Sequence, residues 1–368
     1  MTTQLYSLSI SARAILDMHS LNNEGGEGNQ IQTRMVNIVD QYGQLQNVNA
    51  ISGDMFKHIQ AEHLFHIARE HPDLPLCAGC REFNANRINV DPEFQLFLGE
   101  EETYRDNKGK NKRRQKNSDA DVIDYLLKAC TIDDIEGILI TSAGKRGEEN
   151  PGEDNNAETS EAEEGRGKKR SVPRKSVIEF GWVVGVPEHV ETDSYFHVKY
   201  NMADRAKTQE IREAEAEEGS NIGQAIFHRP ASSGIYAAVC HLELARIGFN
   251  DITQQYAISE EQRVLRAQAL LQSVLYTFLQ PNGAMRSAQA PHLVDFSGVL
   301  TLSSGPVPAP TVSPLKDDYR EQIVRVRDAL ERIAAGTVSV ATFDSLGDFT
   351  DLIGELLQNT VPYELRYA

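Results

Sequence analysis

The sequence has few cysteines, a single tryptophan and no long hydrophobic run. Four Cys in 368 residues are too few for a disulfide framework, so we expect reduced thiols and a cytoplasmic protein. No apolar run reaches the length of a membrane span, and the N-terminus lacks the layout of a signal peptide, so no membrane partner is expected. Apolar residues still make up 40% of the chain, which suffices for a real core.

Positive charge is outnumbered, because 37 Lys and Arg face 54 Asp and Glu and the formal net charge is −17. Such an excess of acid argues against a nucleic-acid partner if it is spread evenly. The acidic residues are not spread evenly. Residues 147–164 are almost wholly acidic or small, which predicts a disordered acidic loop over 146–170. Basic residues cluster at 108–116 and at 168–175. Segregated charge leaves room for a basic groove on an acidic protein.

Residues 52–57, Ser-Gly-Asp-Met-Phe-Lys, precede a predicted helix that runs to Glu70, with Asp54 as its expected N-cap. The first turn of a helix has unpaired N–H groups and the positive end of a dipole. The Ser52 hydroxyl, those amides and the Lys57 ammonium would together form a phosphate site. The alternative is an ordinary capped helix with a solvated lysine.

Cys77 and Cys80 have the spacing of half a zinc site, for which one or more of His63, His66 and His71 could complete the ligands. The sequence has no second Cys pair, so buried and inert thiols are the preferred interpretation. A thioredoxin-like role lacks its βαβ context. Neither a metal nor a cofactor is predicted.

Hydrophobic periodicity predicts an α+β fold. Residues 5–17 alternate as a half-buried strand with a polar outer face, and residues 260–279 have the stripe and the cap of a helix. With the helix after Asp54, the order of the main elements suits a ferredoxin-like βαββαβ sheet with long insertions. One face of such a sheet stays free, and RNA-recognition domains use it for RNA. The other predicted strands are 35–39, 48–51, 135–141, 177–186, 195–200, 234–244 and 293–302, and the other predicted helices are 121–129, 317–335 and 349–357.

Four short segments, in this order and with these elements between them, resemble a known family. They are residues 21–29, 51–58, 232–236 and 281–286. The chain resembles the CRISPR-associated backbone subunit of type I surveillance complexes (Cascade), which is the seventh Cas family of the RAMP superfamily, and most closely its DevR-like branch. The resemblance covers the core of the chain but not the acidic loop or the C-terminus.

The resemblance implies an RRM-like palm with large insertions that form fingers and a thumb. The palm would comprise residues 1–60, the strands within 135–200 and residues 233–305. Residues 61–134, with the basic cluster, would form the helical fingers, and residues 201–232 would form the thumb. Residues 306–368 would be a C-terminal helical segment packed on the outside.

The resemblance further implies a non-catalytic subunit that polymerises along the guide RNA. Its partners would be crRNA, target DNA through the crRNA, other copies of itself and other Cascade subunits: those that process crRNA and the large and small subunits. Such a subunit reads the sugar-phosphate backbone and leaves the bases free for pairing. The implied RNA-binding residues are Arg13, Asn22, Asn23, Asn29, Ser52, Lys57, His58, Ser233, Gly283, Ala284, Met285 and Arg286.

Two other functions remain open at this stage. Related backbone subunits of type III complexes cut target RNA with an Asp after the first strand, and Asp17, Glu24 and Glu27 lie in or near that loop. A transcriptional regulator is the third possibility, although no helix-turn-helix pattern supports it.

Overall fold

The computed structural model describes residues 3–22, 26–27, 30–105, 107, 109–141, 170–200, 224–284 and 289–366; for 26–27, 30–31, 197–200 and 224–227 it describes the backbone alone. The predicted acidic loop therefore lies outside the described residues, apart from its last position, and so do residues 201–223. Helices and strands are mixed in the described part, as expected for an α+β protein.

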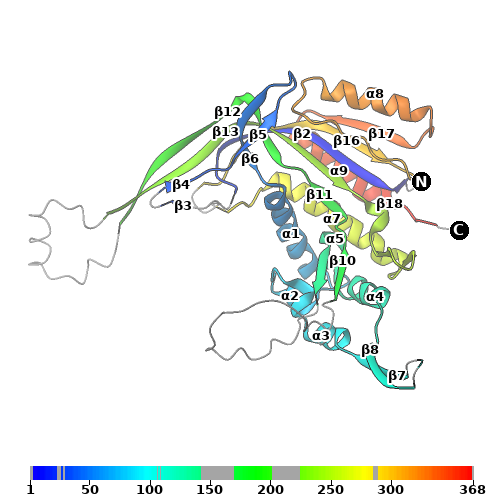
Figure 1. Cartoon of the computed structure of the whole chain (residues 1–368). Helices are drawn as coiled ribbons and strands as arrows, with labels where there is room; N and C mark the ends of the chain where they lie inside the picture. The colour runs from blue at the N-terminus through cyan, green and yellow to red at the C-terminus, as the bar shows by residue number, and fades with distance from the viewer. Residues whose placement is uncertain are drawn as a thin grey trace, which may run out of the picture.

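A large sheet organises the molecule (Figure 1). At its centre β2 (Ser7–His19) pairs antiparallel with both β13 (Gln224–Leu242) and β16 (His292–Ser303), and β13 pairs antiparallel with β12 (Val183–Tyr200). Across the sheet these four strands therefore lie in the order β16, β2, β13 and β12, whereas in the chain the order is β2, β12, β13 and β16. The path continues through β17 (Val338–Phe343) at one end and β6 (Leu45–Ile51) and β5 (Met35–Val39) at the other.

The two faces of β2 differ in composition, and both are buried. Leu8, Ile10 and Ala12 alternate towards the main core, as their period of two predicts. Ser7 and Ser9 point to the opposite face, which is polar as predicted, yet each is only 1% exposed, so the expectation that this face lies on the outside was wrong. Residues 304–318 cover that face, where the Ser9 hydroxyl donates to the Ala309 carbonyl at 3.0 Å.

Helices α1 (Gly53–Glu70) and α7 (Glu260–Leu279) pack together on the core side of the sheet. Helix α9 (Leu346–Asn359) lies there too, because Phe349 packs edge-on against Phe278 and Phe296. The expectation that both C-terminal helices lie outside was therefore wrong for α9, and β17 shows that this segment is not wholly helical. Helix α8 (Tyr319–Glu331) does lie on the other side of the sheet.

A helical lobe lies below α1 in the view of Figure 1. The expected strand at 135–141 begins only at residue 138, because residues 135 and 136 belong to α5 (Thr131–Glu136). Gly137 ends that helix with a φ of +66°, which favours glycine. The lobe also contains α2 (Ala78–Arg81), η1 (Arg87–Val90), α3 (Pro92–Leu98), α4 (Asp119–Ala129), the hairpin β7 (Glu101–Arg105) and β8 (Asn111–Gln115), and the ribbon β9 (Ile138–Thr141) and β10 (Ser171–Arg174).

A buried ion network ties this lobe to α7. The Asp134 carboxylate of α5 accepts from Arg174 of β10 at 2.8 Å and from Arg266 of α7 at 2.7 Å, and all three side chains are fully buried. The Gly248 amide also donates to Asp134, at 3.0 Å. Buried charges remain ionised only when they are paired and hydrogen-bonded in this way.

Beyond the sheet, β12 and β13 continue as a two-stranded arm whose pairing runs to Tyr200 and Gln224 (Figure 1). The smaller elements are β1 (Thr3–Leu5), β3 (Gly26–Glu27), β4 (Gln30–Ile31), β11 (Ile178–Phe180), η3 (Leu244–Arg246), β14 (Phe249–Asn250), β15 (Gln255–Tyr256) and β18 (Thr360–Pro362). No helix in the described ranges has the length and apolarity needed to cross a bilayer.

Candidate nucleic-acid interface

The start of α1 is held tightly in place. Ser52, rather than the expected Asp54, is the N-cap, and its Oγ accepts from the Met55 amide at 3.1 Å. Helix α1 begins at Gly53, where an added Cβ would lie 2.6 Å from the Phe180 carbonyl oxygen. Only a glycine lets the helix start approach β11 so closely.

Asn22 joins the end of β2 to this helix start. Its Nδ2 donates to the Ala50 carbonyl at 2.7 Å, and its Oδ1 accepts from the Ser52 amide at 3.0 Å. Asn22 is 6% exposed and Ser52 is 9% exposed. Both side chains are thus engaged within the protein, where they fix the shape of the loop that the resemblance singled out.

The loop after α7 reaches the same place. The Ala284 amide donates to the Leu21 carbonyl at 3.0 Å. Gly283 is buried, and a Cβ there would lie 2.6 Å from the Leu21 Cα. Three of the four segments that carry the family resemblance, residues 21–29, 51–58 and 281–286, therefore meet in space. The first two are about 30 residues apart in the chain, and the third follows the second by about 230 residues.

The fourth segment lies along the adjoining end of β2. The Ser233 hydroxyl accepts from the Met18 amide at 2.9 Å, next to the pairing of Ser232 with His19. His19 packs edge-on against Tyr236, whose hydroxyl donates to Asn49 Oδ1 at 2.8 Å. Burial lowers the pKa of His19 to about 4, so its ring is neutral near pH 7.

Lys57 and His58 open onto a cavity of about 340 Å³ between α1 and the lobe. The Lys57 ammonium donates to the Glu136 carbonyl at 2.9 Å, so it caps the end of α5. Burial lowers the pKa of Lys57, while the nearby Glu136 raises it. His58 is exposed and lies against the Phe83 ring, with centroids 5.5 Å apart.

Asp54, Arg87 and Glu136 also line this cavity, and no local pattern in the chain predicted a role for Arg87 or Glu136. Arg87 donates to the Gly137 carbonyl at 2.8 Å, on the wall facing α1. Burial raises the pKa of Glu136 to about 7, against the opposing effect of Lys57 and Arg87. Lys57 and Arg87 could bind an anion such as phosphate at the mouth of this cavity, where the carboxylates of Asp54 and Glu136 oppose them.

Arg13 lies on the sheet face opposite the core helices, where the prediction put it, but residues 304–318 occupy that position. Its Nε donates to the Pro314 carbonyl at 2.8 Å, and its Nη2 pairs with Asp317 at 2.9 Å. The predicted free sheet face is therefore covered at Arg13. An RNA contact by Arg13 remains a prediction, and it would require the covering segment to move away.

Four of the predicted RNA-binding residues cannot be placed. Asn23, Asn29, Met285 and Arg286 lie outside the described residues. Of the proposed catalytic carboxylates, the side chains of Glu24 and Glu27 lie outside them as well. Asp17 is half-buried near the end of β2, where its backbone lies opposite that of His292 in the neighbouring strand β16.

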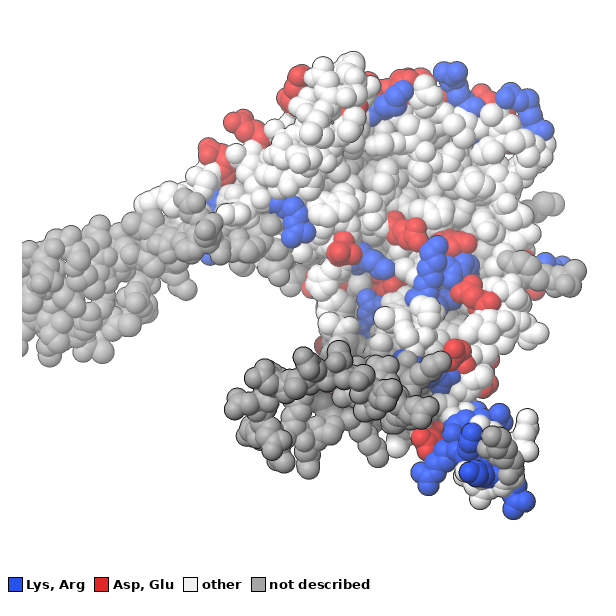
Figure 2. Space-filling model, viewed as in Figure 1, with Lys and Arg blue, Asp and Glu red and all other residues white. Residues whose placement is uncertain are grey.

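The described part of the basic cluster, residues 109–116, is more regular than its composition indicated. It belongs to the β7–β8 hairpin, where Arg114 pairs with Glu102 at 2.6 Å and Lys116 with Glu100 at 2.8 Å. Cross-strand pairs of opposite charge stabilise such a hairpin. Figure 2 shows Lys and Arg side chains gathered at this lower tip of the molecule.

The histidines considered for a zinc site lie elsewhere. The His63 Nε2 bonds to the Gln280 carbonyl at 3.0 Å, the His66 ring lies against Phe65, and the His71 Nδ1 accepts from the Asp73 amide. Cys77 and Cys80 are buried as expected, but their neighbours are Cys130 and Asp133. Spacing along α1 suggested the histidines, whereas tertiary packing brought in residues about 50 positions away.

The fold and this junction define an α+β protein with a mixed-charge cavity at the start of a central helix. The chain belongs to the DevR/Csa2 family, described as "CRISPR-associated negative auto-regulator DevR/Csa2", which it matches over residues 10–324. A search of curated proteins returned no match.

Comparison with solved structures gives distant likenesses. A chain of a "CRISPR RNA-guided surveillance complex, pre-nicking" is 9% identical with a TM-score of 0.40, covering 95% of this chain and 100% of that one. A chain of a "CRISPR RNA-guided surveillance complex" is 10% identical with a TM-score of 0.37, covering 94% and 99%. Csc2 of Thermofilum pendens is 10% identical with a TM-score of 0.35, covering 96% and 80%.

Proposed function

We propose that this chain is a crRNA-binding backbone subunit of a type I CRISPR surveillance complex. Copies polymerise along the spacer of the guide RNA and present it for pairing with target DNA, and the subunit itself performs no chemistry. The family match over residues 10–324 is the observation that carries the proposal. The other subunits of the complex and the crRNA are its partners.

The arrangement of the sheet supports an RRM-like palm. The order β16-β2-β13-β12, all antiparallel, with α1 and α7 on one face, is the order of a ferredoxin-like βαββαβ unit. The arm of β12 and β13 leads to residues 201–223 and suits the proposed thumb. The lobe with the β7–β8 hairpin suits the proposed fingers.

The junction of residues 21–22, 50–58 and 283–284 is the proposed surface for guide phosphates. Its buried members, Asn22 and Ser52, hold the loops in place, and His58, Ala284 and the acidic Asp54 are exposed. Lys57 and Arg87 supply positive charge behind them. A repeating subunit needs few such contacts per copy, because each phosphate that is neutralised adds salt-dependent affinity.

Nucleic acid that co-purifies with the full-length protein from its host tests the proposal. Sequencing should recover RNA derived from CRISPR repeats and spacers, at a regular protein-to-RNA length ratio. Recovery of unrelated cellular RNA only, or specific binding of promoter DNA without any guide, would contradict it. The second outcome would support the auto-regulator role that the family description mentions.

A further inference from the structure

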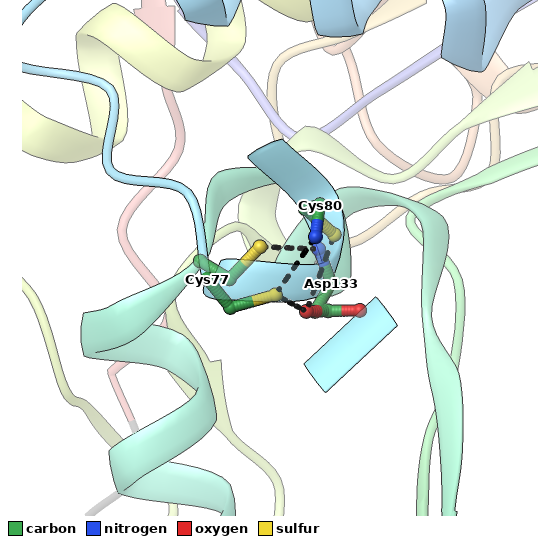
Figure 3. Close-up of side chains that lie close together, drawn as sticks. Cys77, Cys80 and Asp133 are labelled. Atoms are coloured by element: carbon green, nitrogen blue, oxygen red, sulfur yellow. Dashed lines mark hydrogen bonds between the residues drawn. The ribbon is translucent and has the colours of Figure 1, made fainter. Parts of the chain in front are cut away.

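A compact cluster of three thiols and a carboxylate lies in the lobe, and one of its members, Cys80, also lines the cavity beside Lys57 and His58. Cys77 and Cys80 come from the turn into α2, and Cys130 and Asp133 come from the start of α5. One ligand atom from each of the four lies within 4.8 Å of all the others. Figure 3 shows Cys77 and Cys80 directed towards the Asp133 carboxylate.

The distances between the ligand atoms are close to the edge lengths of a tetrahedral metal site. Zinc–sulfur bonds of about 2.3 Å and zinc–oxygen bonds of about 2.0–2.2 Å give edges of about 3.5–3.8 Å. The Asp133 Oδ2 lies 3.3 Å from the Cys77 Sγ and 3.6 Å from the Cys80 Sγ. The remaining separations, at most 4.8 Å, need only a small contraction to meet the same geometry.

The surroundings of Asp133 provide an independent reason to expect a cation. Asp133 and Cys130 are 0% exposed. The Asp133 Oδ1 has no hydrogen-bond partner in the described part of the chain, and no Lys or Arg there forms an ion pair with this carboxylate. A buried carboxylate is costly unless a positive charge compensates it, and nearby thiolates would increase that cost.

We propose that Cys77, Cys80, Cys130 and Asp133 bind one zinc ion. Thiolates favour zinc among the divalent metals, and a tetrahedral arrangement suits it. Three thiolates and one carboxylate carry the same charge as the familiar four-cysteine set. Four buried protein ligands leave no position for substrate, so the site is structural.

Backbone amides complete the surroundings of the sulfurs. The Cys80 amide donates to the Cys77 Sγ at 3.4 Å, and the Asp133 amide donates to the Cys130 Sγ at 3.5 Å. Such N–H···S bonds orient and stabilise thiolate ligands. The ion would fasten α2 to α5, and α5 carries both Asp134 of the buried ion network and the Glu136 carbonyl that binds Lys57.

Metal analysis of the full chain, purified under reducing conditions without chelator, tests the proposal directly. We expect about one zinc per chain. The Cys130→Ser variant should lose at least nine-tenths of it. Cys240→Ser, which alters an equally buried thiol outside the cluster, should retain it. Equal loss in both variants, or full retention in Cys130→Ser, would overturn the assignment.

A second measurement uses only the wild-type protein, so it does not depend on the folding of a variant. Cobalt(II) added to the metal-free reduced chain should produce the thiolate-to-cobalt charge-transfer and strong ligand-field bands of a tetrahedral site. Zinc should then displace these bands. A wild-type chain that yields neither zinc nor this spectrum, or a Cys77–Cys80 disulfide in the protein as isolated, would refute the site. Neither result bears on guide-RNA binding.

Discussion

Several polar side chains near the proposed RNA surface form hydrogen bonds within the protein. Asn22 and Ser52 were predicted as RNA contacts, and the structure shows them joining β2, β6 and α1 by buried hydrogen bonds. Lys57 has a bond of its own, to the Glu136 carbonyl. Substitutions here therefore need controls that separate stability from binding.

Glu136 should make stability depend on pH. Burial raises its pKa from 4.5 to about 7, so the folded state binds a proton more tightly than the unfolded state. Its contribution is fully present below about pH 4.5 and is lost as pH rises through about 7, by up to about 3 kcal/mol. Glu136→Gln stays neutral, so its stability relative to wild type should increase between about pH 5 and pH 8 in urea unfolding. A constant difference would contradict this.

The Asp134 network predicts a large loss of stability from a small change. Asp134→Asn leaves Arg266 buried without a carboxylate and Arg174 with only the half-exposed Asp251, which should cost about 3–5 kcal/mol. Asp318→Asn removes an exposed carboxylate that pairs with Lys316, and it should cost less than about 1 kcal/mol. Chemical denaturation measures both, and similar losses in the two variants would show that the network is not structurally important.

At the scale of helices, two glycines should respond in opposite ways to alanine. Gly53→Ala places a Cβ against the Phe180 carbonyl and should destabilise the start of α1. Gly354→Ala, within α9, meets nothing within 4 Å and should stabilise by up to about 1 kcal/mol, since alanine favours helix. Thermal melts of both variants measure these changes, with a lower Tm expected for Gly53→Ala and a higher Tm for Gly354→Ala. A stable Gly53→Ala protein would mean that α1 can withdraw from β11.

The elements themselves were largely predictable. Strong periodicity identified β2, β16, α1 and α7, because a buried stripe leaves a clear pattern. The hairpin β7–β8 was missed because ion pairs between its strands, rather than apolar alternation, accompany its pairing. Helix α5 was missed, and its last two residues were assigned to a strand, because its six consecutive buried residues, charged ones included, show no amphipathic period.

For the whole molecule, the net charge of −17 makes the strength of the proposed RNA binding depend on where the Lys and Arg side chains lie. Lys57→Gln should weaken binding of guide-type RNA and reduce the slope of log affinity against log salt by about 0.7. Lys175→Gln, at an exposed ion pair with Glu179, should change neither. Filter binding across a salt series measures both quantities. An unchanged slope in Lys57→Gln would remove Lys57 from the interface.

The covering of the second sheet face is also a property of the whole molecule. Residues 304–318 bind β2 through Ser9 and Arg13, and α8 packs on β16 and β17 through Tyr319 and Ile323. The sequence alone suggested an open face, because serines alternate along β2 just as they would on a solvated strand. Nothing local in β2 reveals a segment 300 residues away.

The sequence by itself determined the α+β class, the main strands and helices, and the family, because these depend on periodicity, caps and short motifs that are local in the chain. Only the tertiary structure decided which side chains meet. It brought Leu21, Ser52 and Gly283 together, gave Lys57 a carbonyl partner, and placed Cys130 and Asp133 beside Cys77 and Cys80. Such contacts depend on how a sheet and its covering segments fold back on one another, and sequence spacing carries no record of that.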